Sequence, residues 1–260
     1  MRLVIKVGTS TLSHENGQMN LKRTEKLCRT ISDLQKAGHQ CVLVSSGAIG
    51  MGVSKLRLEG RPKDMPGKQA AAAVGQCELM FIYDKFFGEY GQAVAQVLLT
   101  AEDVADDRRR FHVENALEQL ISWDVLPIIN ENDAVAVDEI GIHTTIGEND
   151  SLSAIVACMI HADLLVLLSD IDGLYTADPR VDEKAMLLET VEELTPQIMA
   201  LGGGAGSNLG TGGMATKLKA ADMAVKAGID MVIANGEYPE RLYDLLDGKS
   251  VGTRFLGKKG

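Results

Sequence analysis

The sequence predicts an α/β protein, a three-layer αβα sandwich with a mostly parallel central sheet. Short apolar runs alternate along the chain with longer segments whose apolar residues recur at helical spacing. The apolar runs contain few polar residues, so strands built from them must be buried on both faces, as in a parallel sheet covered by crossover helices. Of the 260 residues, 45% are hydrophobic and 24% are charged, which is typical of a folded globular protein.

The first half of the chain predicts strands and helices in alternation. The apolar run at residues 3–7 ends at Gly8, and Leu27, Ile31 and Leu34 then recur at helical spacing. Gly38 is a helix stop, and a second apolar strand follows it. The expected elements of this half are strand 3–7, helix 22–37, strand 41–44, helix 69–87, strand 93–99, helix 110–123 and strand 125–129.

The second half begins less regularly, because short alternating pieces at residues 134–137 and 140–145 predict an antiparallel excursion or hairpin. The most hydrophobic strand follows at 164–168, and Ser169 and Asp170 at its carboxyl end lie where parallel sheets bind ligands. No Pro- or Ser-rich linker divides the chain, so we expect one domain over residues 1–256. The expected elements of this half are helix 151–161, strand 164–168, helix 215–227, strand 229–234, helix 239–246 and a small strand at 251–255.

The composition argues against several classes of protein. The formal net charge is −10, from 26 Lys and Arg against 36 Asp and Glu, and aromatic residues make up 4% of the chain. Such a surface repels a phosphate backbone, so no nucleic-acid partner is expected. No apolar stretch approaches the ~20 residues of a membrane span and no signal-peptide core is present, so we expect a cytoplasmic protein without a membrane partner. The scattered cysteines predict no zinc site or redox pair.

Two glycine-containing loops after predicted strands have the composition of anion-binding sites. In KVGTS, at residues 6–10, Lys6 lies near the end of a buried strand, and Gly8 lets backbone N–H groups approach a phosphate. In SSGAIG, at residues 45–50, the strand leads into a helix, and Ser46 is placed to contact a carboxylate. Each loop also has a simpler interpretation, as an ordinary edge lysine and as an N-cap serine without a ligand.

Two further loops pair an asparagine with an aspartate. INENDAV carries Asn132 and Asp133 after an apolar strand, and GENDSLS carries Asn149 and Asp150 at a helix start. Such a pair can hold an amino acid, with the aspartate binding the α-ammonio group and the asparagine amide binding the carboxylate. The alternative for each loop is ordinary turn and helix-cap chemistry.

A glycine-rich loop, LGTGGMATK, runs into a helix whose first turn carries Lys217. Loop N–H groups, the positive end of the helix dipole and the lysine charge together predict a phosphate site. The lysine is not preceded by glycine, so this is not a Walker A sequence. Gly210, Gly212 and Ala215 match the GxGxxA pattern of dinucleotide-binding dehydrogenases, but the loop does not directly follow a strand, which argues against that alternative.

Taken together, these motifs resemble the amino acid kinase superfamily. KVGTS, SSGAIG, INENDAV, GENDSLSA, LLSDIDGLYTADPR and GTGGMATK occur in its order and approximate spacing over nearly the whole chain. The combination of SSGAIG with INENDAV and GEND is most similar to the branch that phosphorylates the side-chain carboxylate of L-glutamate, the first step of proline biosynthesis. The resemblance implies the amino acid kinase fold, with ATP and L-glutamate as substrates and Mg²⁺ as a cofactor.

The resemblance also implies roles for individual residues. Lys6 and Lys217 would contact the phosphates of ATP, and Asp150 would hold the two lysines in position. The implied ATP-binding residues are Lys6, Gly8, Ser169, Asp170, Thr211, Gly212, Gly213, Met214, Ala215, Thr216 and Lys217.

On the side of the amino acid, the resemblance implies that Ser46, Asp133 and Asn149 contact glutamate. The amino-acid lobe would extend over about residues 1–162 and the nucleotide lobe over about residues 163–256, and no side chain is assigned to Mg²⁺. A glutamate carboxylate, with a reference pKa near ~4.3, is already ionised at neutral pH, so no general base or catalytic histidine is expected. The reaction instead needs cations that relieve the repulsion between this carboxylate and the triphosphate.

Other properties of this branch are carried over as expectations. We expect a chain that ends without the C-terminal PUA domain of many members, self-association into a homo-oligomer, and feedback inhibition by proline through a mobile flap at residues 60–75. One alternative is a kinase of another small carboxylate, such as aspartate or N-acetylglutamate. A second is a non-catalytic amino-acid sensor, which predicts a damaged lysine or glycine loop, whereas both are intact in this sequence.

Overall fold

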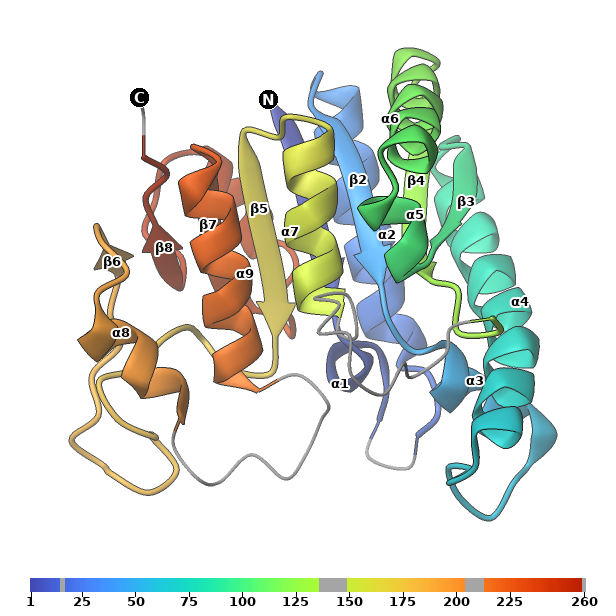
Figure 1. Ribbon diagram of the computed structural model, residues 1–260, viewed down its shortest axis with the longest axis horizontal. Helices are drawn as coiled ribbons and strands as arrows, with labels where there is room; N and C mark the ends of the chain where they lie inside the picture. The colour runs from blue at the N-terminus through green and yellow to red at the C-terminus, as the bar shows by residue number, and fades with distance from the viewer. Residues whose placement is uncertain (15–16, 136–148, 204–212, 259–260) are drawn as a thin grey trace.

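The computed structural model describes residues 1–14, 17–135, 149–203 and 213–258. These residues form one eight-stranded sheet (Figure 1). Neighbouring strands pair in parallel, except β7 and β8, which are antiparallel. The predicted α/β fold with a mostly parallel sheet is therefore confirmed. In spatial order the strands are β3 (Val94–Leu99), β4 (Leu126–Glu131), β2 (Gln40–Ser45), β1 (Arg2–Val7), β5 (Leu164–Ser169), β7 (Asp230–Asn235), β8 (Thr253–Phe255) and β6 (Thr190–Val191).

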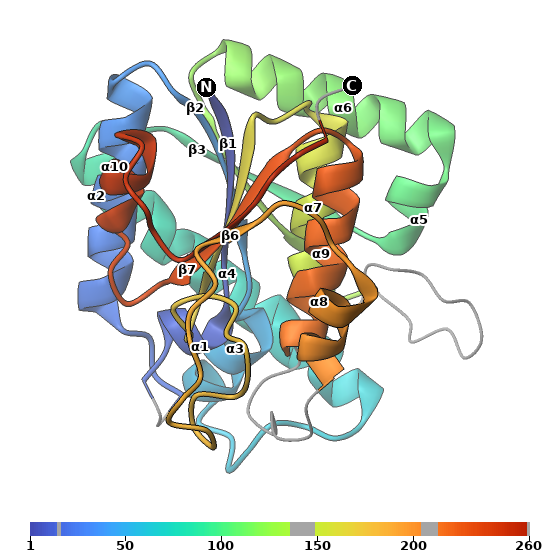
Figure 2. The ribbon, with the colours of Figure 1, turned by 90° about the vertical axis from the view of Figure 1, so that its left-hand side faces the viewer.

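Helices cover both faces of the sheet, which completes the three layers. Figure 2 shows the sheet from its edge, with α2 and α10 on one side and α6, α7 and α9 on the other. The helices that pack on the sheet are α2 (Leu21–Lys36), α4 (Met65–Glu89) and the short α10 (Arg241–Leu246) against one face and α6 (Asp107–Ser122), α7 (Asn149–Met159) and α9 (Met214–Lys226) against the other. Shorter helices are α1 (Thr9–Leu12), α3 (Ala48–Leu56), α5 (Ala101–Ala105), α8 (Pro196–Ala200) and the 3₁₀ helix Leu201–Gly203.

The strands pack into two hydrophobic cores, one on each face of the sheet. In β5, Leu165 and Leu167 pack with α7 and α9, whereas Leu164, Val166 and Leu168 pack with α2 and α4. Each of these five side chains is at most 2% exposed. Burial on both faces explains why this strand is apolar throughout rather than alternating with polar residues.

The structure differs from the prediction in its shortest elements. The hydrophobic pattern did not predict α1, α5, α8 or β6, because elements of two to five residues are too short to show a period. Of the predicted antiparallel excursion, Ala134 and Val135 lie in a turn after β4 rather than in a strand. The other residues of that prediction, from 136 to 145, lie outside the described residues.

The predicted flap at residues 60–75 is wrong over most of its length, because α4 begins at Met65. The side chain of Asp64 caps this helix by accepting a hydrogen bond from the backbone N–H of Gly67, and Pro66 occupies the first turn, where its missing N–H is not needed. In the part of the chain that the structure describes, no helix, α4 included, is both long and apolar enough to cross a membrane.

The parallel strands bring several distant loops to one edge of the sheet. β1, β2, β4, β5 and β7 all end at this edge, and α3, α7 and α9 begin there (Figure 1). The pairing of β1 with β5 joins the first half of the chain to the second. The edge therefore collects the motifs predicted to carry the chemistry.

Candidate active site

Two lysines from opposite ends of the chain meet at one aspartate. Lys6 lies near the end of β1, Asp150 in the first turn of α7, and Lys217 in the first turn of α9. Nζ of Lys6 lies 2.6 Å from Oδ1 of Asp150, and Nζ of Lys217 lies 3.2 Å from Oδ2. The three residues are 8%, 1% and 6% exposed in chain order. The structure thus brings together the three residues that the sequence predicted as the catalytic group.

The two lysines determine the charge of Asp150. Burial by itself raises the pKa of this carboxyl group, but the charges of Lys6 and Lys217, with hydrogen bonds from Lys6 and Thr216, outweigh burial and lower the pKa below its ordinary value of 3.8. Asp150 is therefore ionised at neutral pH. Two ammonium groups against one carboxylate leave a surplus positive charge, which suits an anionic ligand.

Small residues lie against the lysine cluster. A Cβ atom at Gly8 would lie 3.4 Å from Nζ of Lys6, so the backbone of Gly8 passes close to this ammonium group. Gly8 is the N-cap of α1 and Gly213 is the N-cap of α9. The hydroxyl of Thr216 lies 2.9 Å from Oδ2 of Asp150 and 2.8 Å from the carbonyl oxygen of Gly213. Thr216, predicted to contact ATP, thus contacts Asp150 in this structure.

Ser46 and Asn149, two residues predicted to bind the amino acid, contact each other. Nδ2 of Asn149 lies 2.7 Å from Oγ of Ser46, 3.3 Å from the carbonyl oxygen of Ser45 and 3.0 Å from Oδ1 of Asn130. These acceptors occupy both N–H groups of the amide. Oδ1 of Asn149 is buried and has no hydrogen-bond partner among the described residues. In this arrangement Asn149 suits an ammonio group, whereas the sequence-based hypothesis gave its amide the substrate carboxylate.

Asp133, the third predicted substrate residue, lies in the turn after β4. Its side chain forms no hydrogen bond or ion pair with the residues that the structure describes, and it is partly exposed. Burial raises its pKa above 3.8, and the charge of Arg61 acts in the opposite direction. The turn places Asp133 at the same sheet edge as Ser46 and Asn149, and none of the hydrogen bonds of Asn149 described above reaches it.

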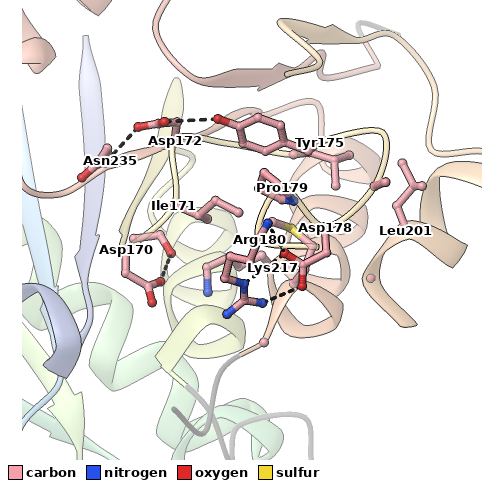
Figure 3. A pocket seen from close by; sticks show the side chains of 16 residues that line it. Asp170, Ile171, Asp172, Tyr175, Asp178, Pro179, Arg180, Leu201, Lys217 and Asn235 are labelled. Atoms are coloured by element: carbon pink, nitrogen blue, oxygen red, sulfur yellow. Dashed lines mark hydrogen bonds and ion pairs between the residues drawn. The ribbon is translucent and has the colours of Figure 1, made fainter. Parts of the chain in front are cut away.

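A pocket of about 470 Å³ opens beside Lys217, at the ends of β5 and β7 (Figure 3). Half of its 16 lining residues have polar side chains, and most of these follow the ends of the two strands. Ser169, Asp170, Gly213, Met214 and Lys217, all predicted to bind ATP, line it. Lys6, Gly8, Ala215 and Thr216 are not among its lining residues, and the predicted contacts Thr211 and Gly212 lie outside the described residues.

Several pocket residues were missed by the sequence-based prediction. Asp172 accepts hydrogen bonds from Nδ2 of Asn235 at 2.8 Å and from the hydroxyl of Tyr175 at 3.2 Å. Asp178 pairs with Arg180 through Nε at 3.0 Å and Nη2 at 2.9 Å. All five residues line the pocket, as Figure 3 shows. A signal was present, since the turn-rich GLYTADPR segment follows the carboxyl end of a buried strand.

Comparison with known proteins identifies the family. The model of the amino acid kinase family matches residues 1–235. Glutamate 5-kinase of Clostridium perfringens is 56% identical over 259 residues, which cover 100% of this chain and 96% of that protein. Glutamate 5-kinase of Clostridium acetobutylicum is 53% identical over 257 residues, covering 99% and 95%.

A solved structure supports the fold independently of sequence. Carbamate kinase from Giardia lamblia bound to AMP-PNP superimposes with a TM-score of 0.70 at 18% identity, covering 99% of this chain and 98% of that one. At that identity the likeness shows a shared fold, whereas the two clostridial relatives show closer kinship. The chain belongs to the amino acid kinase family and, within it, to the glutamate 5-kinases.

Proposed function

We propose that this chain transfers the γ-phosphoryl group of ATP to the side-chain carboxylate of L-glutamate, forming L-glutamyl 5-phosphate, the first step of proline biosynthesis. The observation that carries the proposal is the meeting of Lys6 and Lys217 at the ionised Asp150, beside a polar pocket. Membership of the glutamate 5-kinases supports the choice of substrates.

The chemistry needs positive charge more than it needs a base. The glutamate carboxylate is already ionised at neutral pH, so no proton has to be removed before it attacks the γ-phosphorus. Its approach to a triphosphate is opposed by charge repulsion, and the developing charge on the transferred group needs cations at fixed positions. Lys6 and Lys217 supply these cations. Asp150 holds both ammonium groups in place, and one carboxylate against two ammonium groups leaves a net positive charge.

The pocket at the ends of β5 and β7 would take the nucleotide. Its polar lining offers hydrogen bonds to the base and ribose, and Lys217 lies where the pocket meets the lysine cluster. Arg180 is a further cation of the pocket, held by Asp178. Gly8 and the N-terminus of α9 would bring backbone N–H groups to the phosphates.

We also propose that Mg²⁺ accompanies the nucleotide. Mg²⁺ at nucleotide sites is bound by one or two carboxylates together with phosphate oxygens and water. Asp170 fits this role, because it lies in the pocket, whereas both oxygens of Asp150 already face lysine ammonium groups. The ion would neutralise phosphate charge during the transfer.

The amino acid would lie at the ends of β2 and β4. The carbonyl oxygen of Asn149, which has no partner among the residues that the structure describes, suits the α-ammonio group, and Asp133 supplies a carboxylate for the same group. Ser46 lies next to Asn149 and offers a hydroxyl. The glutamate carboxylate would thus lie near the ends of β2 and β4, and the phosphoryl donor near the ends of β5 and β7. The two lysines would lie between them.

The test is an assay of ADP formation with Mg²⁺ and ATP, supplied in turn with L-glutamate, L-aspartate or N-acetylglutamate. We expect turnover with L-glutamate and trapping of the product by hydroxylamine as the γ-hydroxamate. Faster turnover with aspartate or N-acetylglutamate than with L-glutamate would identify that compound as the substrate instead. Absence of turnover with all three, together with amino-acid binding, would favour a sensor.

Three further proposals depend on family membership. Proline would inhibit by competing with glutamate, the chain would form a homo-oligomer, and the enzyme would act in the cytoplasm, where ATP is available. Adding proline to the same assay tests the first of these, and sedimentation at several protein concentrations tests the second. Fractionation of cells tests the third.

A further inference from the structure

A chain of three amide side chains lies beneath the amino-acid loops. Nδ2 of Asn149 donates to Oδ1 of Asn130 at 3.0 Å, and Nδ2 of Asn130 donates to Oε1 of Gln76 at 3.0 Å. The three residues come from α7, β4 and α4. Asn130 is 2% exposed and Gln76 is 8% exposed, so the lower part of the chain is buried.

Backbone groups determine which way each amide faces. The backbone N–H of Glu131 donates to Oδ1 of Asn130 at 2.9 Å, and an N–H group cannot accept, so the oxygen of Asn130 must face it. Nδ2 of Asn130 then faces Gln76, which must present its oxygen. The backbone carbonyl of Ser45 lies 3.3 Å from Nδ2 of Asn149 and can only accept. The nitrogen of Asn149 must therefore face Ser45, which also directs it toward Oδ1 of Asn130. Each orientation is therefore required by its neighbours.

Packing alone does not account for Gln76. Its Nε2 atom is buried and has no hydrogen-bond partner among the described residues. A buried donor without a partner is costly, and an apolar side chain of similar size would fill the same space without that cost. What glutamine provides here, and an apolar residue would not, is Oε1, which accepts the hydrogen bond from Nδ2 of Asn130.

Two glycines bring Gln76 to this position. A Cβ atom at Gly75 would lie 1.8 Å from the carbonyl oxygen of Ala48, and a Cβ atom at Gly52 would lie 1.8 Å from the carbonyl oxygen of Ala71. α3 and α4 therefore cross at a separation that only glycine permits at these positions. The close crossing places Gln76, next to Gly75, at the carboxyl end of β4.

We infer that Gln76 is a positioning residue of the amino-acid site, which acts through Asn130 to hold Asn149 against Ser46. The inference rests on the proposed function, since it concerns the binding of glutamate. The Gln76 oxygen accepts from Nδ2 of Asn130, so it anchors the far end of an amide whose oxygen the backbone N–H of Glu131 already holds. The anchored Asn130 then offers a fixed acceptor to Asn149, whose own oxygen has no partner among the described residues. Without the Gln76 oxygen, Asn130 loses the acceptor for its N–H groups, and Asn149 loses a fixed partner.

The test compares Gln76→Met with Gln76→Glu. Methionine keeps the length of the side chain and removes the oxygen, whereas glutamate keeps an oxygen that can receive Nδ2 of Asn130. We expect Gln76→Met to raise KM for glutamate about tenfold, the effect of losing one buried hydrogen bond, with KM for ATP and kcat within about twofold of wild type. We expect Gln76→Glu to restore most of the glutamate affinity.

Gln92→Met is the matched control. Gln92 is also a buried glutamine, 6% exposed, whose Nε2 donates to the backbone carbonyls of Ala93 and Asp124 at the opposite end of the sheet. We expect this variant to lose stability without a change in KM for glutamate. Should Gln76→Met not fold, Gln76→Asn replaces it, because a side chain one methylene shorter keeps the amide but withdraws its oxygen from Asn130.

The outcomes separate this inference from the proposed function. A wild-type enzyme that does not phosphorylate glutamate would overturn both. An active wild type in which Gln76→Met and Gln92→Met have the same KM for glutamate would overturn the inference alone. An equal rise in KM for glutamate and for ATP in Gln76→Met, or no recovery in Gln76→Glu, would also overturn it.

Discussion

Replacing Asp150 with asparagine keeps the shape of the side chain and removes its charge. The ammonium groups of Lys6, at 2.6 Å, and Lys217, at 3.2 Å, would then face one another with no carboxylate between them. Neutralising one partner of a buried ion pair typically costs about 3–5 kcal/mol, and we expect a loss of unfolding free energy in this range at pH 7. We expect kcat to fall about 10²- to 10³-fold, as when a well-placed polar group is removed from an active site.

The same variant has a signature in its pH dependence. The pKa of Asp150 in the folded protein is lowered below 3.8, so its contribution to stability is fully present above the unfolded-state pKa of ~3.9. That contribution is lost as the pH falls below this value and through the folded-state pKa. We therefore expect the unfolding free energy of the wild type to decrease more steeply in acid than that of Asp150→Asn.

Urea unfolding at pH 7 and at a series of acidic pH values, with and without ATP, measures these effects. ATP should narrow the stability gap, because its phosphate oxygens supply negative charge beside the two lysines. An Asp150→Asn variant with wild-type stability at pH 7 and wild-type kcat would refute the conclusion that Asp150 holds the lysines in place.

Three further predictions concern single side chains. Lys217→Ala should lower kcat about 10²- to 10³-fold, and an unchanged kcat in the purified variant would contradict its role. Asp133→Ala should raise KM for glutamate and leave KM for ATP nearly unchanged, so equal effects in steady-state kinetics would count against its placement. Gly75→Ala should lower the unfolding free energy by about 3 kcal/mol or more, because the new Cβ atom would lie 1.8 Å from the carbonyl oxygen of Ala48. Gly88→Ala in the same helix is its control, since nothing lies within 4 Å of the new atom, and should stabilise α4 by up to about 1 kcal/mol in urea unfolding.

The sequence predicted the layers of the fold because the continuous apolar runs of the strands and the helical spacing of apolar residues are both clear. The run at residues 164–168 is apolar at every position, and β5 is buried at every position. The prediction was wrong at the start of α4, where Gly60, Pro62, Pro66 and Gly67 favour a loop. A signal was present, because Asp64 followed by Pro66 is typical of a helix N-terminus.

The candidate site was predictable only in part from local sequence. Local sequence predicted separate anion sites at Lys6 and Lys217, and only their order within a family resemblance grouped the two lysines with Asp150. Nothing local to the sequence pairs Gln76 with Asn130, because their hydrogen bond depends on how closely α3 and α4 cross. The missed pocket residues Asp172 and Asn235 likewise meet only because β5 and β7 are neighbours in the sheet.

A crystal structure of the enzyme with L-glutamate, Mg²⁺ and AMP-PNP tests the central claim most directly. We expect Nζ of Lys6 and Nζ of Lys217 both to lie at hydrogen-bond distance, about 3 Å, from oxygens of the nucleotide phosphates, with the glutamate side-chain carboxylate in line with the γ-phosphorus. Lysine ammonium groups that point into separate cavities, with one of them away from the phosphates, would contradict it.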